Sequence, residues 1–225
     1  MKVELVNYSK PPSYHSSQSL QDLVAYCARV SNPENQNNTQ TNEKLIRYLI
    51  KNNHWSPLEM VSICLEIETT RDIARQILRH RSFSFQEFSQ RYAVVDTSAF
   101  ERRECRLQDE TNRQNSIELT GELSNVVLED DWETVQDYVA EVCENAYKWA
   151  ISKSIAKEQA RCVLPEGMTI SRMYVNGTLR SWVHYIRLRS SNGTQKEHRE
   201  IALACANAIK PIFPMIMSLL EEDGK

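Results

Sequence analysis

The clearest pattern along this chain is a strict alternation of apolar and polar residues between Met60 and Glu68. Its apolar members are Val61, Ile63, Leu65 and Ile67. Because successive side chains of a strand point to opposite faces of a sheet, this alternation predicts a strand with one buried face. Segments at residues 2–8 and 169–175 predict two further strands, and residues 92–96 are expected to form a fourth.

Helical spacing dominates the remainder of the chain. The segments with this periodicity are residues 18–30, 42–52, 69–80, 131–153, 155–163, 178–189 and 194–220, the last of them kinked or ended by Pro211 and Pro214. A turn is expected at Asn176-Gly177 and a polar surface loop at residues 32–43. Residues 97–130 are charged and weakly periodic, which fits a lid and a solvated loop equally well.

Few strands among many helices indicate an α+β fold. We expect one domain, residues 1–225, in which a small antiparallel or mixed sheet packs with several long helices.

The composition argues against several classes of protein. The 225 residues carry a formal net charge of −3, whereas proteins that coat nucleic acids are usually strongly basic. No apolar run is long enough to span a membrane, and the first residues lack the apolar core of a signal peptide. Six scattered cysteines without a Cys-x-x-Cys pair, and five dispersed histidines, predict reduced thiols, a cytoplasmic location and no metal site.

The candidate chemistry concentrates between residues 79 and 91. Arg79-His80-Arg81 is followed after seven residues by Ser89-Gln90-Arg91, with phenylalanines and Glu87 in between. Guanidinium groups match phosphate and carboxylate oxygens, and three of them repel one another unless an anion lies between them. The segment therefore suits a planar ligand that carries phosphate. The alternative is that Arg79, His80 and Arg81 only stabilise the end of the 69–80 helix through its dipole.

The pattern of Arg-His-Arg, seven residues, Ser, one residue and Arg resembles the signature of the flavin-dependent thymidylate synthases. Four other segments resemble parts of that family in the same order: Ala28 to Ser31, His54 to Glu59, Ala160 to Pro165, and Leu179 to Arg189. The resemblance implies an enzyme that methylates dUMP to dTMP. Methylenetetrahydrofolate would supply the carbon, FAD would carry the hydride, and NADPH is the expected reductant. It also implies a homotetramer whose active sites are shared between chains.

The same resemblance implies the residues of the site. Those expected at FAD are Ser56, Arg79, His80, Arg81, Glu87, Thr178, Leu179, Arg180 and His184. Those expected at dUMP are Gln76, Ile77, Leu78, Arg79, Glu87, Phe88, Ser89, Gln90, Arg91, Arg161 and Arg189. Arg189 is the expected catalytic residue, because a fixed guanidinium beside the uracil edge stabilises negative charge that develops on the ring. Arg189 also suits the last turn of a helix, where the dipole favours a cation.

The residue chemistry agrees with parts of this assignment. The chain has no Gly-x-Gly-x-x-Gly turn and no P-loop, so side chains such as Arg79, His80 and Arg81 must hold the FAD pyrophosphate. Arg91 and Arg161 are the candidate cations for the substrate phosphate. Ser89 lacks the glycines and the ordered histidine of a nucleophile, so it is assigned to ligand binding. Cys162 lies in an apolar Cys-Val-Leu segment and is interpreted as a buried structural thiol.

Two other functions are compatible with the signature. A single-stranded nucleic-acid binding module would use the arginines and phenylalanines of residues 79–92 as a phosphate and stacking surface, but the net acidity argues against it. A nucleotide-binding regulatory protein without catalysis is the second. The presence of Ser89, Arg161 and Arg189 argues against that one.

Overall fold

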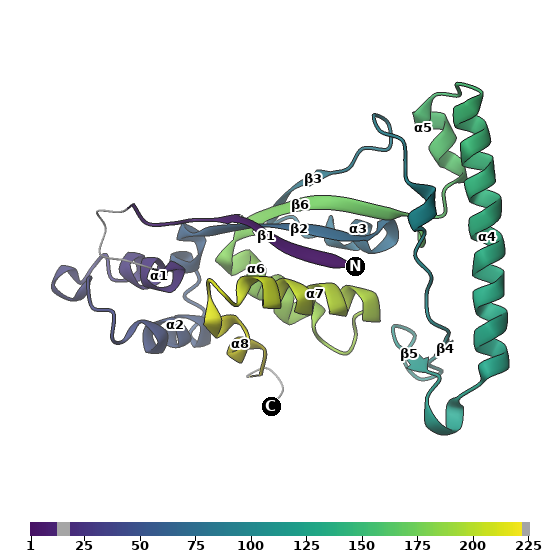
Figure 1. Cartoon of the computed structure of the whole chain (residues 1–225). Coiled ribbons are helices and arrows are strands. Elements are labelled where there is room, and N and C mark those ends of the chain that lie inside the picture. The colour runs from purple at the N-terminus through teal and green to yellow at the C-terminus, as the bar shows by residue number, and fades with distance from the viewer. Residues whose placement is uncertain (13–18, 222–225) are drawn as a thin grey trace.

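The centre of the molecule is a four-stranded antiparallel sheet (Figure 1). The computed structural model describes residues 1–12 and 19–221. The strands, in the order β1-β2-β6-β3, are β1 (Lys2–Tyr8), β2 (Ser62–Thr70), β6 (Ile170–Thr178) and β3 (Phe83–Glu87). The predicted α+β class is therefore confirmed, and the sheet is antiparallel throughout.

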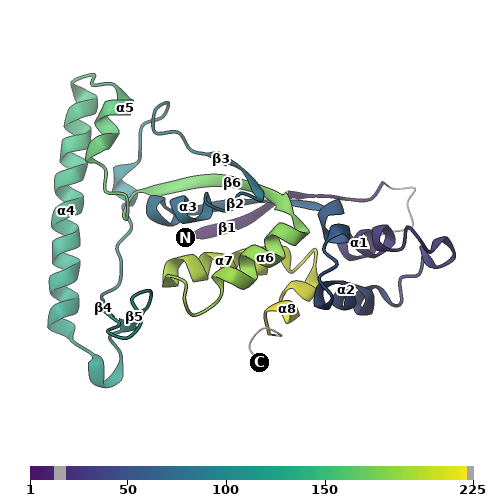
Figure 2. The same ribbon diagram turned by 180° about the vertical axis from the view of Figure 1, so that it is seen from behind.

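Helices surround this sheet on one face and at both ends (Figures 1 and 2). The α-helices are α1 (Leu20–Ala28), α2 (Asn42–Lys51), α3 (Arg71–Ile77), α4 (Val126–Ser152), α5 (Lys157–Ala160), α6 (Leu179–Arg189), α7 (Lys196–Ile209) and α8 (Ser218–Glu221). Single 3-10 turns are η1 (Pro33–Asn35), η2 (Ser56–Met60), η3 (Thr97–Ala99), η4 (Gly121–Leu123), η5 (Arg161–Val163) and η6 (Pro214–Ile216). Among the described helices, none is both long and apolar enough to cross a membrane.

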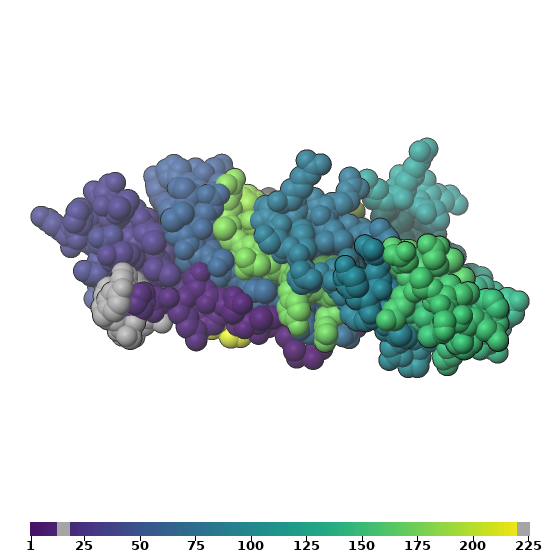
Figure 3. Space-filling view, turned by 90° about the horizontal axis from the view of Figure 1, so that it is seen from above, coloured from purple at the N-terminus to yellow at the C-terminus, as the bar shows by residue number. Residues whose placement is uncertain are grey.

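The main core lies between the sheet and the pair α6 and α7. Along β6 the buried Ser171, Met173 and Val175 alternate with exposed residues, so one face of the strand packs inward. Trp182 and Tyr185 of α6 fill the space beneath it. Viewed from the other side, residues of β1 and β6 lie at the surface, which shows that helices cover a single face of the sheet there (Figure 3).

The structure corrects two sequence predictions around β6. Asn176-Gly177 is not a turn, because β6 continues to Thr178 and Gly177 pairs with Phe83 of β3. The Phe83 ring lies directly over Gly177, where a β-carbon would come within 2.3 Å of it. The glycine is therefore required by close approach and not by a reversal of the chain. The predicted strand at residues 92–96 does not form, and the neighbouring strand is β3 instead.

The segment at residues 97–125, which we term the strap, is anchored to the body of the molecule. It contains the short hairpin β4 (Arg106–Gln108) and β5 (Ser116–Glu118), and α4 begins after it at Val126, earlier than predicted. Arg103 contacts Asp72 at 3.0 Å and Glu197 at 3.2 Å, and Arg106 also pairs with Glu197. The buried Glu197 thus joins the strap to α7, so the strap is neither a free lid nor an unattached loop.

Candidate functional site

The Arg79-His80-Arg81 turn lies against α6. It follows α3, and the chain then enters β3. The Ser181 hydroxyl donates to the carbonyl of Ser82 at 3.1 Å, and the Nε of Arg189 donates to Nε2 of His80 at 3.0 Å. Burial and the adjacent Arg189 lower the pKa of His80 below its usual range. At neutral pH His80 is therefore an uncharged acceptor, so its expected part as a third cation does not fit its surroundings.

Gln76 is fixed by residues of α7 and the segment before it. Its Oε1 lies 3.1 Å from Nδ1 of His198, and its Nε2 donates to Oε1 of Gln195 at 2.8 Å. Burial, with lesser contributions from Arg189 and His80, lowers the pKa of the fully buried His198 to about 3. His198 is therefore neutral and donates from Nδ1 to Gln76.

In the part of the chain that the structure describes, Arg79 and Arg81 lack the ion pairs that many other arginines form. Both are exposed, and within the described residues neither has a carboxylate partner. The arginines that do pair with carboxylates include Arg71, Arg75, Arg91, Arg102, Arg103, Arg106 and Arg180. Two uncompensated guanidinium groups that flank one position provide the forked donors that bind phosphate oxygens.

A second group of expected residues gathers where β6 meets α6. The Trp55 and His184 rings lie 4.2 Å apart between centroids, and Arg180 forms an ion pair with Glu59 of η2. Thr178 caps α6 by accepting from the backbone N–H of Ser181. This group joins η2, which includes Ser56, to the first turns of α6.

Three expected contact residues instead belong to the core or pack against it. Leu179 is fully buried, and its N–H donates to the carbonyl of Val61 at 3.0 Å. Ile77 is also buried, and Leu78 packs against the same core. Their side chains face the core and support the site from behind.

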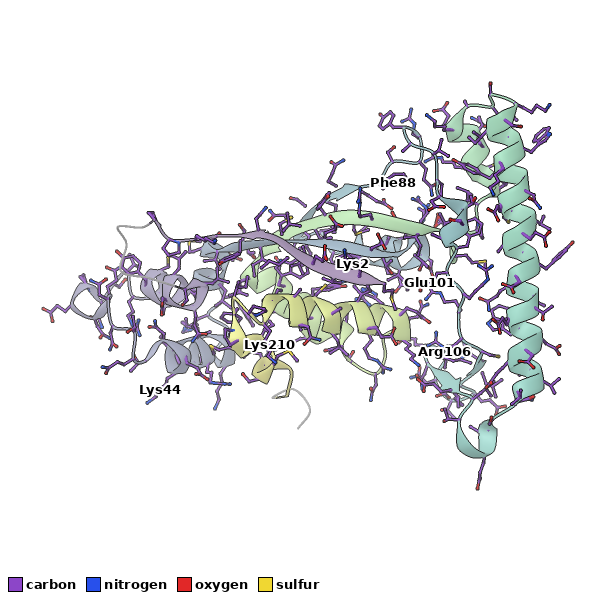
Figure 4. The ribbon with its side chains drawn as sticks, in the orientation of Figure 1. Lys2, Lys44, Phe88, Glu101, Arg106 and Lys210 are labelled. Carbon is purple, nitrogen blue, oxygen red and sulfur yellow. The ribbon has the colours of Figure 1, made fainter. Side chains whose placement is uncertain are left out.

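The third group lies at the other end of β3. The carboxylate of Glu87 accepts from Ser171 at 2.6 Å and from Arg71 at 3.3 Å, and Arg91 pairs with Glu158 at 3.3 Å. Phe88 packs against a second core cluster that includes Val95 and Tyr147, at the end of the sheet toward α5 (Figure 4).

The remaining members of this third group differ in burial. Gln90 is buried, and its Nε2 has no partner within the described residues. Ser89 is half-buried, and its hydroxyl accepts from the N–H of Arg91 at 3.4 Å. Arg161 is half-buried in η5 and has no carboxylate partner among the described residues.

The expected site residues of one chain thus fall into separate places. At about 3.3 Å per residue, the five residues of β3 alone place its two ends roughly 13 Å apart. The chain brings His80, Arg189 and Gln76 together at one end, and Glu87, Arg91 and Arg161 lie toward the other. A single copy does not assemble them into one pocket.

The cysteines give one correction to the sequence prediction. Cys162 is exposed and not buried, because Arg161–Val163 form a single 3-10 turn with no element packed over that side chain. Burial raises the pKa of Cys27, Cys64 and Cys205, which disfavours their thiolate forms. Within the described part of the chain, no cluster of histidine, cysteine or acidic residues could hold a metal ion.

Comparison with known proteins places this arrangement in a family. A family model described as thymidylate synthase complementing protein matches residues 14–215. A probable flavin-dependent thymidylate synthase of Paramecium bursaria Chlorella virus 1 is 44% identical over 225 residues, covering 98% of this chain and 99% of its own length. The flavin-dependent thymidylate synthase of Synechocystis is 45% identical over 224 residues, covering 98% of this chain and 100% of its own.

This chain belongs to the flavin-dependent thymidylate synthase family. Its fold is also similar to that of the UMP/dUMP methylase PolB from Streptomyces cacaoi, whose crystal structure contains 5-Br dUMP. That similarity has a TM-score of 0.81 at 26% identity, over 98% of this chain and 94% of PolB.

Two residues that contact the candidate site of this flavin-dependent thymidylate synthase family member were not predicted from the sequence. Trp55 stacks near His184, and its position beside Ser56 in the His54 to Glu59 segment was the available signal. His198 carries no local signal, because its contact with Gln76 spans 122 positions of sequence.

Proposed function

We propose that this chain methylates dUMP to dTMP, with methylenetetrahydrofolate as the carbon donor and NADPH as the reductant. The observation that carries the proposal is the Arg189 guanidinium, held by a neutral His80 between two arginines that lack carboxylate partners. The nucleic-acid binding alternative is disfavoured because Phe83 is buried and Phe85 and Phe88 pack against core clusters, so they provide no open stacking surface.

The residues present suit FAD, which belongs to the activity of the family. Arg79 and Arg81 offer free forks for a pyrophosphate, and Ser56, Arg180 and His184 line the junction beside Trp55. Reduced FAD supplies the hydride when it is bound. His80 contributes by orienting Arg189 and not by adding a positive charge.

Arg189 is the proposed catalytic residue. Its Nε is occupied by His80, and its terminal nitrogens form no side-chain hydrogen bond within the described residues. They are therefore available to the carbonyl and N–H edge of a uracil ring, where a fixed cation stabilises developing negative charge. Arg91 and Arg161 are proposed to bind the substrate phosphate, and Glu158 then holds Arg91 in place until the phosphate arrives.

We further propose a homotetramer with active sites shared between chains. The support is the separation of His80 and Arg189 from Glu87, Arg91 and Arg161 within one chain. A second copy can bring one group opposite the other. The six free cysteines support a cytoplasmic location, because reduced thiols are typical of that compartment.

The test is a titration of purified flavin-loaded protein with dUMP. Binding at a shared pocket should change the flavin absorbance spectrum or accelerate flavin reduction by NADPH. Supplying methylenetetrahydrofolate as well should then yield dTMP, measured by chromatography. A protein that retains flavin, shows no response to dUMP and forms no dTMP would contradict the proposal.

A further inference from the structure

Helix α4 carries an apolar stripe that differs from the one facing the body of the molecule. The stripe consists of Leu128, Trp132, Val135, Val139, Val142, Ala146 and Trp149. Its members alternate at intervals of four and three residues, the spacing by which one helix packs lengthwise on another. The buried residues of α4 are instead Gln136, Ala140, Tyr147 and Ala150. The helix therefore has a second apolar face, and most of that face stays exposed in the fold of one chain.

The second face is open to solvent. Val135 is 52% exposed, Val142 49% and Trp149 59%. Figures 1 and 2 both show α4 at the edge of the molecule, with no described element on its outer side. Side chains project outward from it there (Figure 4). An apolar stripe of this length on a soluble helix marks an interaction surface.

The stripe continues into a hollow at its N-terminal end. A volume of about 540 Å³ lies between α4 and the strap, bordered by Leu107 of the strap and by Leu128, Trp132 and Val135. The indole N–H of Trp132 donates to the carbonyl of Arg103 at 3.1 Å, which fixes the position of that ring. The strap thus holds the start of the stripe in a defined shape.

We propose that this stripe binds the α4 helix of a second copy of the chain, in antiparallel orientation around a twofold axis near Val139. A twofold contact requires a surface that is complementary to itself, and the stripe is centred close to Val139. This inference rests on the proposed assembly and not on the proposed reaction.

The charges along α4 select the antiparallel orientation. Residues 126–138 carry five carboxylates and no cation, at positions 129, 130, 131, 133 and 137. Residues 139–152, the other half of α4, carry two carboxylates and one lysine, Lys148. Parallel helices would place five carboxylates beside five others. Antiparallel helices place them beside the half that has a net charge of only −1, so the repulsion between the two helices is much weaker.

The first test measures the mass of the flavin-loaded protein by light scattering. Val135→Glu and Val142→Glu introduce a charge into the stripe and should each lower the mass of the assembly at least twofold. Val127→Glu is the matched control, since Val127 is a 71% exposed valine of α4 outside the stripe. It should leave the mass unchanged. Folded stripe variants that keep the parent mass would overturn the proposal.

The second test uses an engineered cysteine in the helix and does not depend on a destabilising charge. Cys105 and Cys143 are first replaced by alanine, because both lie near the stripe. In that background Val139→Cys should give a disulfide-linked dimer on oxidation. Leu128→Cys should give none, because antiparallel pairing places the two Leu128 positions about 30 Å apart.

The outcomes separate the assembly from the chemistry. Linkage at residue 139 alone supports the proposal. Linkage at both positions shows parallel pairing and overturns it, as does linkage at neither. A monomeric parent protein that forms dTMP would refute the contact but leave the proposed reaction intact, whereas an inactive protein with linkage at residue 139 alone would refute only the reaction.

Discussion

Arg189 donates its Nε–H to Nε2 of His80 across 3.0 Å, and this bond determines the state of both groups. It requires His80 to carry its proton on Nδ1 and leaves the terminal nitrogens of Arg189 free. The other groups that face His80 are Tyr185 of α6 and His198 of α7. Neither titrates near neutrality, because burial raises the pKa of Tyr185 and lowers that of His198 to about 3.

Removing the acceptor from His80 should therefore misplace Arg189. His80→Leu is expected to lower turnover up to about a hundredfold at saturating dUMP, a loss typical of a displaced catalytic group. His80→Gln, whose carbonyl can reach the same guanidinium, should retain most of the activity. Single-turnover dTMP formation in flavin-loaded variants measures both effects. Equal rates for His80→Leu and the parent would show that the bond has no catalytic role.

The pH profile gives an independent check on the same bond. As the pH falls through the lowered pKa of His80, its ring gains a proton and no longer accepts from Arg189. Turnover of the parent should decline on that acid side, and the decline attributable to His80 should be absent in His80→Gln. If the turnover of the parent and of His80→Gln fell equally at low pH, the decline would be due to another group.

Substitutions of Arg189 and of Arg91 should affect different steps, turnover for Arg189 and dUMP binding for Arg91. Arg189→Ala is expected to reduce single-turnover rates about a hundred- to a thousandfold, equivalent to roughly 3 to 4 kcal/mol of transition-state stabilisation. Lysine should rescue only part of this loss, because an ammonium group lacks the planar fork. Arg91→Ala should mainly weaken dUMP binding, since the phosphate charge changes little during the reaction. Near-parent turnover of saturated Arg189→Ala would reduce Arg189 to a helix-end cation.

No cysteine should be essential for activity. Cys162 is the exposed thiol beside Arg161, and the buried thiols have raised pKa values. Replacing each of the six by alanine or serine, one at a time, should leave substantial dTMP formation wherever the fold survives. A folded variant that binds FAD and dUMP but forms no dTMP would establish a thiol mechanism.

Gly177→Ala should destabilise the sheet. The added β-carbon would lie 2.3 Å from the Phe83 ring, so the ring or the β3–β6 pair must shift. We expect a loss of about 1 to 3 kcal/mol in the free energy of unfolding, measured by denaturant titration. Gly167→Ala is the matched control, because no atom lies within 4 Å of its added carbon and its backbone is not in the left-handed region. Equal stabilities for the two variants would refute the packing explanation.

His198 should make the fold sensitive to acid. Its pKa is about 3 in the folded chain and near 6.5 in the unfolded one, so acid protonates the unfolded chain first. The contribution is complete above about pH 6.5 and declines as the pH falls toward 3, by roughly 2 kcal/mol between pH 7.5 and 5. His198→Asn keeps a donor near the Nδ1 position and cannot titrate there. Its unfolding free energy should depend less steeply on pH, and an unchanged slope would contradict the prediction.

Local sequence patterns were sufficient to predict most of the longer helices and strands. The alternation at residues 61–67 identified β2, and helical spacing identified α1, α2 and α6 within a few residues, as well as the start of α7. The strand β3 was not predicted, although Phe83 and Phe85 alternate with polar residues, because β3 lies within the signature segment at residues 79–91. Asn176-Gly177 was misread because a turn sequence and a glycine under an aromatic ring look alike without the partner strand.

The sequence by itself determined the family and the fold class and supplied the candidate residues of the site, because these depend on side-chain order and spacing within short segments. Only the tertiary structure decided which arginines pair with carboxylates and which do not. It also decided that His80 is a neutral hydrogen-bond acceptor and that Gln76 is hydrogen-bonded to His198. The tertiary structure further decided that α4 presents a second apolar face to solvent. The physical reason is that charge state, burial and pairing depend on contacts between residues far apart in the chain, such as the 109 positions that separate His80 from Arg189.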